Sequence, residues 1–167
     1  MDDVRVTETI AADSTAVYDL IGDVTRMGEV SPETTSCRWL DGADGPRVGA
    51  RFRGSNKYGL RRWSTTCTVT AAEPGRRFAF SVTFGGVAIS DWAYGIARTK
   101  DGCRVTETWV DRRPAWMRIS SVPLMGIVDR GGHNRAGMRS TLAALKAAAE
   151  APDRGRQPRP SGSNVTR

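Results

Sequence analysis

The chain has 167 residues, of which 39% are apolar and 26% charged, a composition typical of a single globular domain. No stretch contains the roughly 18 consecutive apolar residues that a membrane-spanning helix needs. The first residues, Met1-Asp2-Asp3-Val4, are acidic, unlike the basic and then apolar start of a secretory signal. We therefore expect a cytoplasmic protein with no membrane span.

The net charge is +7 at pH 7, and the bases are unevenly distributed. Residues 51–62 contain Arg51, Arg53, Lys57, Arg61 and Arg62 and no acid. Such a stretch can serve a module that binds protein or RNA, and that alternative stays open. The excess of Arg over Lys, together with many Ala and Gly, is however typical of GC-rich, actinobacterial-like genomes, so nucleic acid is not the expected partner.

Three cysteines, Cys37, Cys67 and Cys103, are odd in number and far apart, which predicts reduced thiols. His133 is the single histidine, and no two of these four residues lie within metal-ligand spacing. The glycines do not form a phosphate-binding or dinucleotide-binding motif. The sequence therefore predicts neither a metal site nor a cofactor.

The first predicted elements are a strand and two short helices, because the spacing of apolar residues changes after Ile10 from strand-like alternation to a helical period. Alternation over Val4–Ile10 predicts a strand. Asp13 or Ser14 is suited to cap a helix that ends at Gly22, and Asp23 is suited to cap a second short helix.

Between Thr34 and Asp111 no helical period occurs, and turn residues separate six further strands. We expect these strands at Cys37–Leu40, Ala50–Asn56, Leu60–Ala72, Arg76–Phe84, Ala88–Thr99 and Cys103–Asp111. Connections this short make neighbouring strands antiparallel. The Asp-Gly pair in Lys100-Asp101-Gly102 suits a two-residue hairpin turn.

A helix is predicted from Val128 to Glu150, with Pro152 as its stop. One long helix and one long sheet bury their apolar faces best against each other. The predicted fold is therefore α+β, a helix grip in which a seven-stranded curved antiparallel sheet surrounds the C-terminal helix, with two short helices after the first strand. Residues 1–151 form this domain, and the polar residues 152–167 form a disordered basic tail.

Five local motifs lie along this order of elements: Ala11–Tyr18, Asp23–Glu33, Glu73–Phe80, Val105–Trp109 and His133–Met138. With the element order over residues 3–150, they resemble the START-like (SRPBCC) superfamily, in particular its bacterial polyketide cyclase/dehydrase-like members. The resemblance implies that a hydrophobic ligand such as a lipid, sterol or polyketide binds between sheet and long helix. Some members of that family cyclise or dehydrate polyketides.

Side-chain alternation along each strand predicts which residues face the helix and line such a cavity. These candidate ligand-binding residues are Asn56, Trp63, Phe80, Trp92, Tyr94 and Trp109 on strands, and Asn134 and Met138 on the helix. Pro123 interrupts the segment before the helix, which makes 116–127 a candidate lid with Met117 and Met125 in its wall. The alternative is plain core packing for the aromatic residues and a bent linker for the segment.

Glu107 is the candidate catalytic residue, because Val105 and Trp109 place it on an apolar inward face. A buried carboxylate must be paired or protonated. Glu8 is placed similarly in the first strand, and in the resembled fold the first and last strands are neighbours, so the two carboxyls are candidates to meet. Either carboxyl can be a structural hydrogen-bond partner or an acid or base in a dry pocket.

The sequence thus predicts a protein, monomeric or homodimeric, that binds a small hydrophobic ligand of polyketide, lipid or acyl type. A cofactor-free polyketide aromatase/cyclase or dehydratase is the first alternative. A non-enzymatic protein- or RNA-interaction module is the second.

Overall fold

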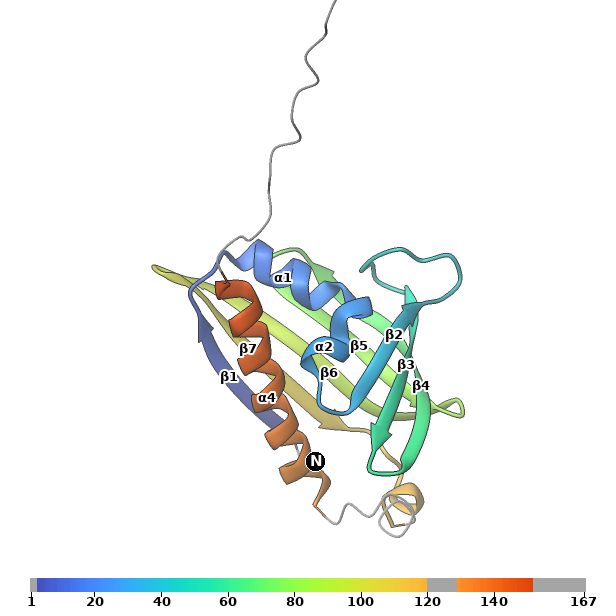
Figure 1. Cartoon of the computed structure of the whole chain (residues 1–167). Helices are drawn as coiled ribbons and strands as arrows, with labels where there is room; N and C mark the ends of the chain where they lie inside the picture. Colours follow the sequence, from blue (N-terminus) through green and yellow to red (C-terminus); the bar gives the residue numbers. More distant parts are fainter. Residues whose placement is uncertain (1–2, 120–128, 152–167) are drawn as a thin grey trace, which may run out of the picture.

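The computed structural model describes residues 3–119 and 129–151 and contains one sheet, one long helix and shorter helical segments (Figure 1). In chain order the elements are β1 (Asp3–Ile10), α1 (Ser14–Gly22), the 3-10 turn η1 (Val24–Arg26), α2 (Met27–Val30), β2 (Thr34–Trp39), β3 (Arg51–Tyr58), β4 (Arg61–Glu73), β5 (Arg77–Phe84), β6 (Val87–Thr99), β7 (Gly102–Asp111) and α4 (Arg130–Glu150). Residues 115–119 are also helical.

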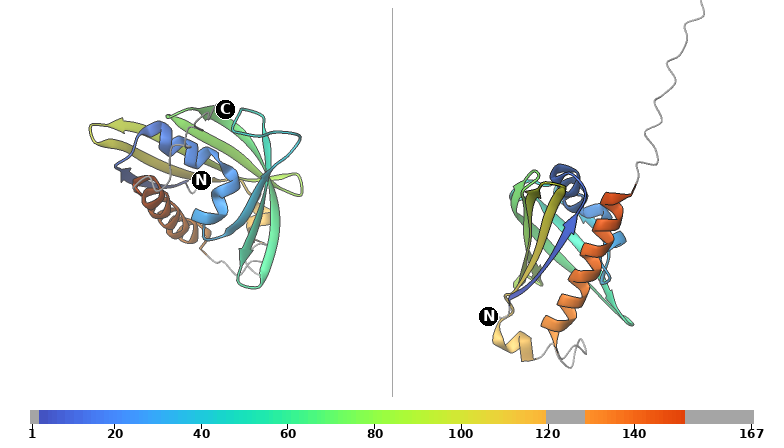
Figure 2. Two further views of the ribbon diagram at one scale, coloured as in Figure 1. Left: turned by 45° about the horizontal axis from the view of Figure 1, so that its top comes forward. Right: turned by 90° about the vertical axis from the view of Figure 1, so that its left-hand side faces the viewer.

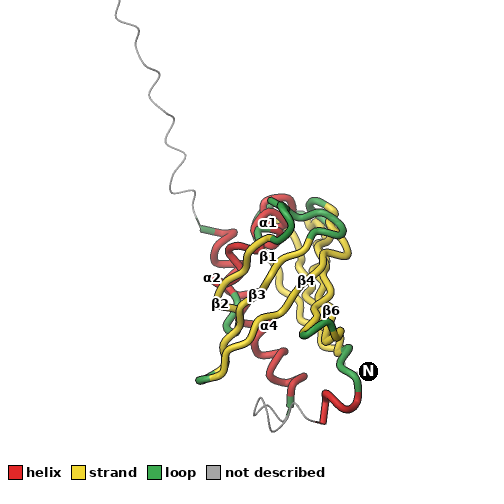
Figure 3. The backbone as a smooth tube through the Cα atoms, turned by 90° about the vertical axis from the view of Figure 1, so that its right-hand side faces the viewer, coloured by secondary structure: helices red, strands yellow, loops and turns green. Residues whose placement is uncertain are grey.

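The sheet has the strand order β1-β7-β6-β5-β4-β3-β2, and every neighbouring pair is antiparallel. Strands β2 to β7 follow one another as hairpins, whereas α1, η1 and α2 carry the chain from β1 across to the opposite edge. Figure 2 shows the sheet curving around α4, and the tube in Figure 3 shows β2, β3 and β4 bending toward it. The predicted seven-stranded helix-grip fold is confirmed.

Most strand bounds lie within two residues of the predicted ones, and two differences affect the packing. Strand β2 begins three residues early, because Thr34 already pairs with Asn56 of β3. The loop residues of the β6–β7 hairpin are Lys100 and Asp101, and Gly102 is the first residue of β7 with φ +146°. A Cβ at Gly102 would collide with the carbonyl oxygen of Ile10, so the close approach of β1 requires glycine there.

The two predicted caps after β1 are present. Asp13 accepts a hydrogen bond from the Thr15 amide at 2.8 Å and begins α1, and Asp23 accepts one from the Thr25 amide at 3.2 Å and begins η1. Val17 of α1 and other apolar side chains of this segment are fully buried against the sheet. The segment therefore closes one end of the sheet, which we call the closed end.

Helix α4 lies along the concave face, in contact with β1 and α1. Asp129 caps it by accepting a hydrogen bond from the Gly132 amide at 2.8 Å, and the helix begins at Arg130, two residues after the predicted start. The buried side chains of α4 are Asn134, Met138, Thr141, Leu142 and Leu145. The predicted inward face is thus present, although Ala149 and Gly131 are only half-buried. The predicted tail 152–167 and most of the candidate lid lie outside the described residues.

The interior is packed unevenly along the strands. Toward the closed end, apolar side chains from the sheet and α4 form one continuous core that includes Phe52, Phe78, Val105 and Leu142. At the other end lie the β3–β4 turn, the β5–β6 turn and the start of α4 (Figure 1). There the inward-facing Trp63 and Trp92 are only half-buried. We call this the open end.

No helix among residues 3–119 and 129–151 is long and apolar enough to cross a membrane. The three cysteines are free thiols, as predicted.

Candidate functional site

The strand register places most of the candidate residues on the concave face. Phe80, Tyr94, Trp109 and Glu107 are buried there, and Asn134 and Met138 of α4 are buried against them. Trp109 packs with Val4 and Met138 in a small cluster at the β1 edge, so this indole is part of the core. Asn56, Trp63 and Trp92 face the same interior but stay half-buried. The candidate set therefore divides into a buried floor and a partly accessible rim.

Glu107 and Tyr94 form a buried pair in this floor. They are direct partners in the β6–β7 register, and the Tyr94 hydroxyl donates a hydrogen bond to Glu107 Oε1 at 2.8 Å. Glu107 is 2% exposed. Burial raises the pKa of Glu107 to about 8, although the bond from Tyr94 opposes the shift. Burial also raises the pKa of Tyr94 well above its usual value. The pair is therefore neutral at pH 7, with Glu107 as a protonated acid.

Among the residues that the structure describes, two buried side-chain polar atoms have no hydrogen-bond partner: Glu107 Oε2 and Asn134 Nδ2. Asn134 is 4% exposed and lies one helical turn before Met138, which contacts Trp109. Leaving such an atom unpaired costs roughly 1–3 kcal/mol, so native proteins keep few of them without a reason. The amide offers a donor, and the protonated carboxyl offers a second one.

Glu8 was expected to approach Glu107, and the two do occupy the same face, since Glu8 pairs with Val105 and Glu107 with Val6. Their side chains nevertheless have different partners. Lys146 of α4 donates to Glu8 Oε1 at 3.1 Å and to the Thr9 carbonyl at 2.7 Å. The Glu8 carboxylate forms an ion pair with this half-exposed amine, whereas no cation among the described residues pairs with Glu107.

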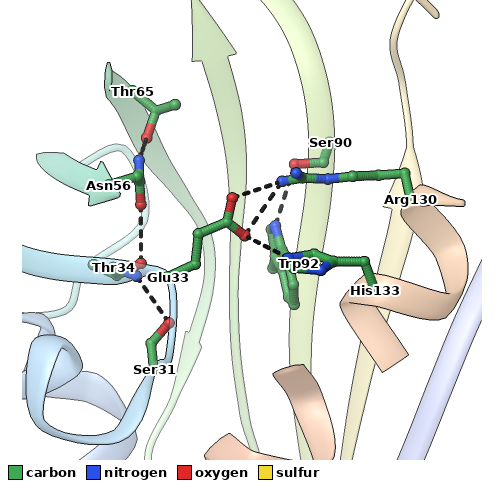
Figure 4. Close-up of polar contacts among 9 residues, drawn as sticks. All are labelled: Ser31, Glu33, Thr34, Asn56, Thr65, Ser90, Trp92, Arg130 and His133. Atoms are coloured by element: carbon green, nitrogen blue, oxygen red, sulfur yellow. Dashed lines mark hydrogen bonds and ion pairs between the residues drawn. The ribbon is translucent and has the colours of Figure 1, made fainter. Parts of the chain in front are cut away.

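Polar side chains line the rim on the β2–β3 side. Asn56 accepts a hydrogen bond from Thr34 Oγ1 at 3.0 Å and donates one to Thr65 Oγ1 at 3.3 Å. The Thr34 amide in turn donates to Ser31 Oγ at 3.2 Å. This chain of bonds (Figure 4) fixes the Asn56 amide, so Asn56 has a structural role that the sequence did not show.

A second polar contact joins the rim to the start of α4. Arg130 Nη2 donates to both oxygens of Glu33, at 3.2 and 3.4 Å, and His133 Nε2 lies 3.7 Å from Glu33 Oε2. Figure 4 shows Glu33 extending from the loop before β2 toward the helix. The His133 ring also meets Tyr58 edge-on at 5.0 Å. These contacts tie the two sides of the open end together.

Glu33 and Arg130 were not among the predicted residues. Glu33 is the last residue of a motif singled out in the sequence, but its partner lies 97 positions away and no local pattern connects them. Met117 is half-buried in the helical residues 115–119. Met125 lies outside the described residues.

The thiols are poor nucleophiles. Burial raises the pKa of Cys37 to about 11 and that of Cys67 to about 12. Among the described residues, no group of three His, Cys, Asp or Glu side chains gathers as a metal ion would require. Glu107, Tyr94 and Asn134 can form hydrogen bonds to a bound molecule, and Glu107 can also transfer a proton.

A curved antiparallel sheet around a C-terminal helix, with polar groups buried between them, defines the helix-grip class of α+β proteins. Residues 1–150 match the family model described as polyketide cyclase / dehydrase and lipid transport. The chain belongs to this family, and the predicted resemblance is confirmed.

Solved structures agree with this assignment. A polyketide-cyclase-like protein of Corynebacterium glutamicum is 31% identical, with 92% of this chain and 96% of that chain covered and a TM-score of 0.60. A Chromobacterium violaceum protein is 16% identical, with 92% and 100% covered and a TM-score of 0.69. The di-domain ARO/CYC StfQ from the steffimycin biosynthetic pathway is 14% identical, with 89% and 50% covered and a TM-score of 0.65. The latter two show the shared fold alone. No curated protein is significantly similar to this chain.

Proposed function

We propose that the protein binds a small, largely apolar ligand that carries hydrogen-bond acceptors, such as a polyketide-, lipid- or acyl-like ketone. The ligand lies between the concave face of the sheet and α4 and enters at the open end. The observation that carries this proposal is the pair of unpartnered buried atoms, Glu107 Oε2 and Asn134 Nδ2. Acceptor atoms on a ligand would complete both groups and remove the cost of burying them unpaired.

The surroundings support the same ligand chemistry. Aromatic side chains such as Phe80, Tyr94 and Trp109 dominate the floor, as is usual in small-molecule sites. The protonated Glu107 and the Asn134 amide are both donors, which favours neutral carbonyl or ether oxygens over cations. The family description, with its polyketide and lipid ligands, agrees with this preference.

The neutral naphthyl ketone prodan tests the proposal, because it has an apolar ring system, one carbonyl acceptor and an emission that shifts to the blue in apolar surroundings. We expect saturable binding with a blue shift and with quenching of tryptophan emission. Asn134→Leu should weaken binding roughly threefold to tenfold, the value of one hydrogen bond. Val48→Ala, in the exposed loop near the closed end, is the control and should bind as the wild type does. Absence of saturable binding, or equal affinity in Asn134→Leu, would contradict the proposal.

The second candidate function is catalysis in the same site, and the pKa of about 8 at Glu107 favours it, because both protonation states are accessible near neutral pH. In a dehydration, the Glu107 carboxylate removes the α-proton of a β-hydroxy ketone. It then returns that proton to the departing hydroxyl, which gives an enone and water. Glu107→Gln should abolish turnover of such a ketone and retain prodan binding. Unchanged turnover in that variant would exclude Glu107 as the acid–base group.

A further inference from the structure

The turn between β3 and β4 presents an apolar residue to solvent. Gly59 and Leu60 form a two-residue loop, with Gly59 at φ +58° as the first position of such a turn requires. Leu60 is fully exposed at the tip, and Tyr58 beside it is also exposed. A two-residue hairpin turn ordinarily carries Gly, Asn or Asp, so a fully exposed leucine at its tip is unusual.

A second element displays apolar side chains at the same end of the molecule. In the helical residues 115–119, Trp116 is 62% exposed and Ile119 is 76% exposed. Figures 1, 2 and 3 all show this segment and the β3–β4 turn at the open end, near the start of α4. Exposed apolar residues on two separate elements therefore lie at the same end of the molecule.

Bases flank the hairpin tip. Lys57, Arg61 and Arg62 are exposed, and none of them has an ion-pair partner within the part of the chain that the structure describes. The acid beside this hairpin, Glu33, whose backbone carbonyl accepts from the Lys57 amide, is already paired with Arg130. The hairpin tip thus combines an apolar point with positive charge that no described acid neutralises.

We propose that the open end docks on an anionic lipid surface, with Leu60, Trp116 and Ile119 in the interfacial layer and Lys57, Arg61 and Arg62 on lipid headgroups. Exposed leucine, isoleucine and tryptophan side chains partition into the acyl–headgroup boundary, and neighbouring bases add attraction to acidic lipids. A polynucleotide would use the bases but gives no role to a leucine at the turn. A lipid surface accounts for both features.

This docking would place the accessible rim of the ligand site against the membrane. Asn56, Trp63 and the Glu33–Arg130 contact lie at the same end as Leu60. An apolar ligand would then exchange between the site and the bilayer without crossing water, although docking itself requires no ligand.

Vesicle co-sedimentation tests the docking with the full chain. Phosphatidylcholine vesicles with and without phosphatidylglycerol are the two surfaces. We expect binding to the anionic vesicles only. Each base removed should lower the affinity for these vesicles roughly fivefold, so the triple variant Lys57→Gln/Arg61→Gln/Arg62→Gln should bind about a hundredfold more weakly. Leu60→Ser should also weaken binding. Melting temperatures of all variants are measured alongside, to show that they are folded.

Matched control variants remove three other exposed bases, or one other exposed apolar side chain, near the closed end. Arg77→Gln/Lys100→Gln/Arg104→Gln changes three exposed bases, and Val48→Ser changes one exposed apolar residue. Both should bind vesicles as the wild type does. Equal losses in the triple variant and its control, no effect of Leu60→Ser, or binding of single-stranded RNA in preference to anionic vesicles would overturn the proposal.

Discussion

The hydroxyl of Tyr94 donates a hydrogen bond to Glu107 Oε1 at 2.8 Å, across directly paired positions of β6 and β7. This bond satisfies one oxygen of a carboxyl that has no cation among the described residues. The other oxygen remains unpaired in the interior. The proton on Glu107 and the free oxygen together determine what this site can bind.

Glu107 should make stability depend on pH. In the folded chain its pKa is raised to about 8 from the ordinary 4.5, so between these values the folded state holds a proton that the unfolded state has released. Stability therefore falls as pH rises from about 5 to 8, by about 1.4 kcal/mol for each pH unit at which the two states differ by a full proton. Denaturant unfolding of wild type and Glu107→Gln measures this difference.

The Gln variant keeps the acceptor for Tyr94 but cannot ionise, so its stability should vary much less over that interval. The exposed Glu73→Gln serves as control and should keep the wild-type slope. Parallel slopes in wild type and Glu107→Gln would show that Glu107 ionises normally in the folded protein.

Removing the Tyr94 hydroxyl should lower the stability of the fold more at high pH than at low pH. The hydrogen bond from Tyr94 lowers the pKa of Glu107 against the effect of burial, which means that it stabilises the charged form. Tyr94→Phe should therefore destabilise the fold by roughly 1–3 kcal/mol at pH 9 and by less at pH 5. The control is Tyr58→Phe, whose hydroxyl has no hydrogen-bond partner among the described residues and should change stability little. An equal loss at both pH values would contradict this account.

Two asparagines should respond oppositely to replacement by leucine. Asn134 buries an amide nitrogen without a partner, so Asn134→Leu should leave the free energy of unfolding unchanged or raise it. Asn56 both accepts and donates hydrogen bonds, so Asn56→Leu should lower it by roughly 1–3 kcal/mol. Urea denaturation without ligand compares them, and a large loss in Asn134→Leu would mean that its amide has a structural partner.

Replacing each of two glycines that have positive φ by alanine should lower stability by different amounts. Gly102→Ala brings a Cβ against the Ile10 carbonyl oxygen and 2.9 Å from Ala11 Cα, so the β1–β7 edge must shift. The loss should exceed about 2 kcal/mol. Gly85→Ala, at φ +56° with open space around it, should cost only about 1 kcal/mol of backbone strain. Thermal unfolding of both variants ranks them, and equal losses would contradict the packing argument.

The sequence predicts the fold and the inward faces well because both follow from local period and turn chemistry. Alternation alone places Glu107 between Val105 and Trp109 on the concave side, where the structure has it. Its hydrogen bond to Tyr94 depends on the exact register between β6 and β7, and the alternation of side chains alone does not determine that register. The hydrogen bond from Lys146 to Glu8 joins residues that are 138 positions apart. Such pairings are properties of packing, and no local pattern predicts them.

The most direct measurement of the central claim is the side-chain amide region of a ¹H–¹⁵N NMR spectrum during titration with prodan. The chain has only three asparagines and one glutamine, Asn56, Asn134, Asn164 and Gln157, so the amide pairs are readily assigned by substitution. A ligand carbonyl that accepts from Asn134 Nδ2 should shift the Asn134 pair downfield and leave the Asn164 and Gln157 pairs unchanged. An Asn134 pair that does not move while prodan binds would contradict a ligand site between the sheet and α4.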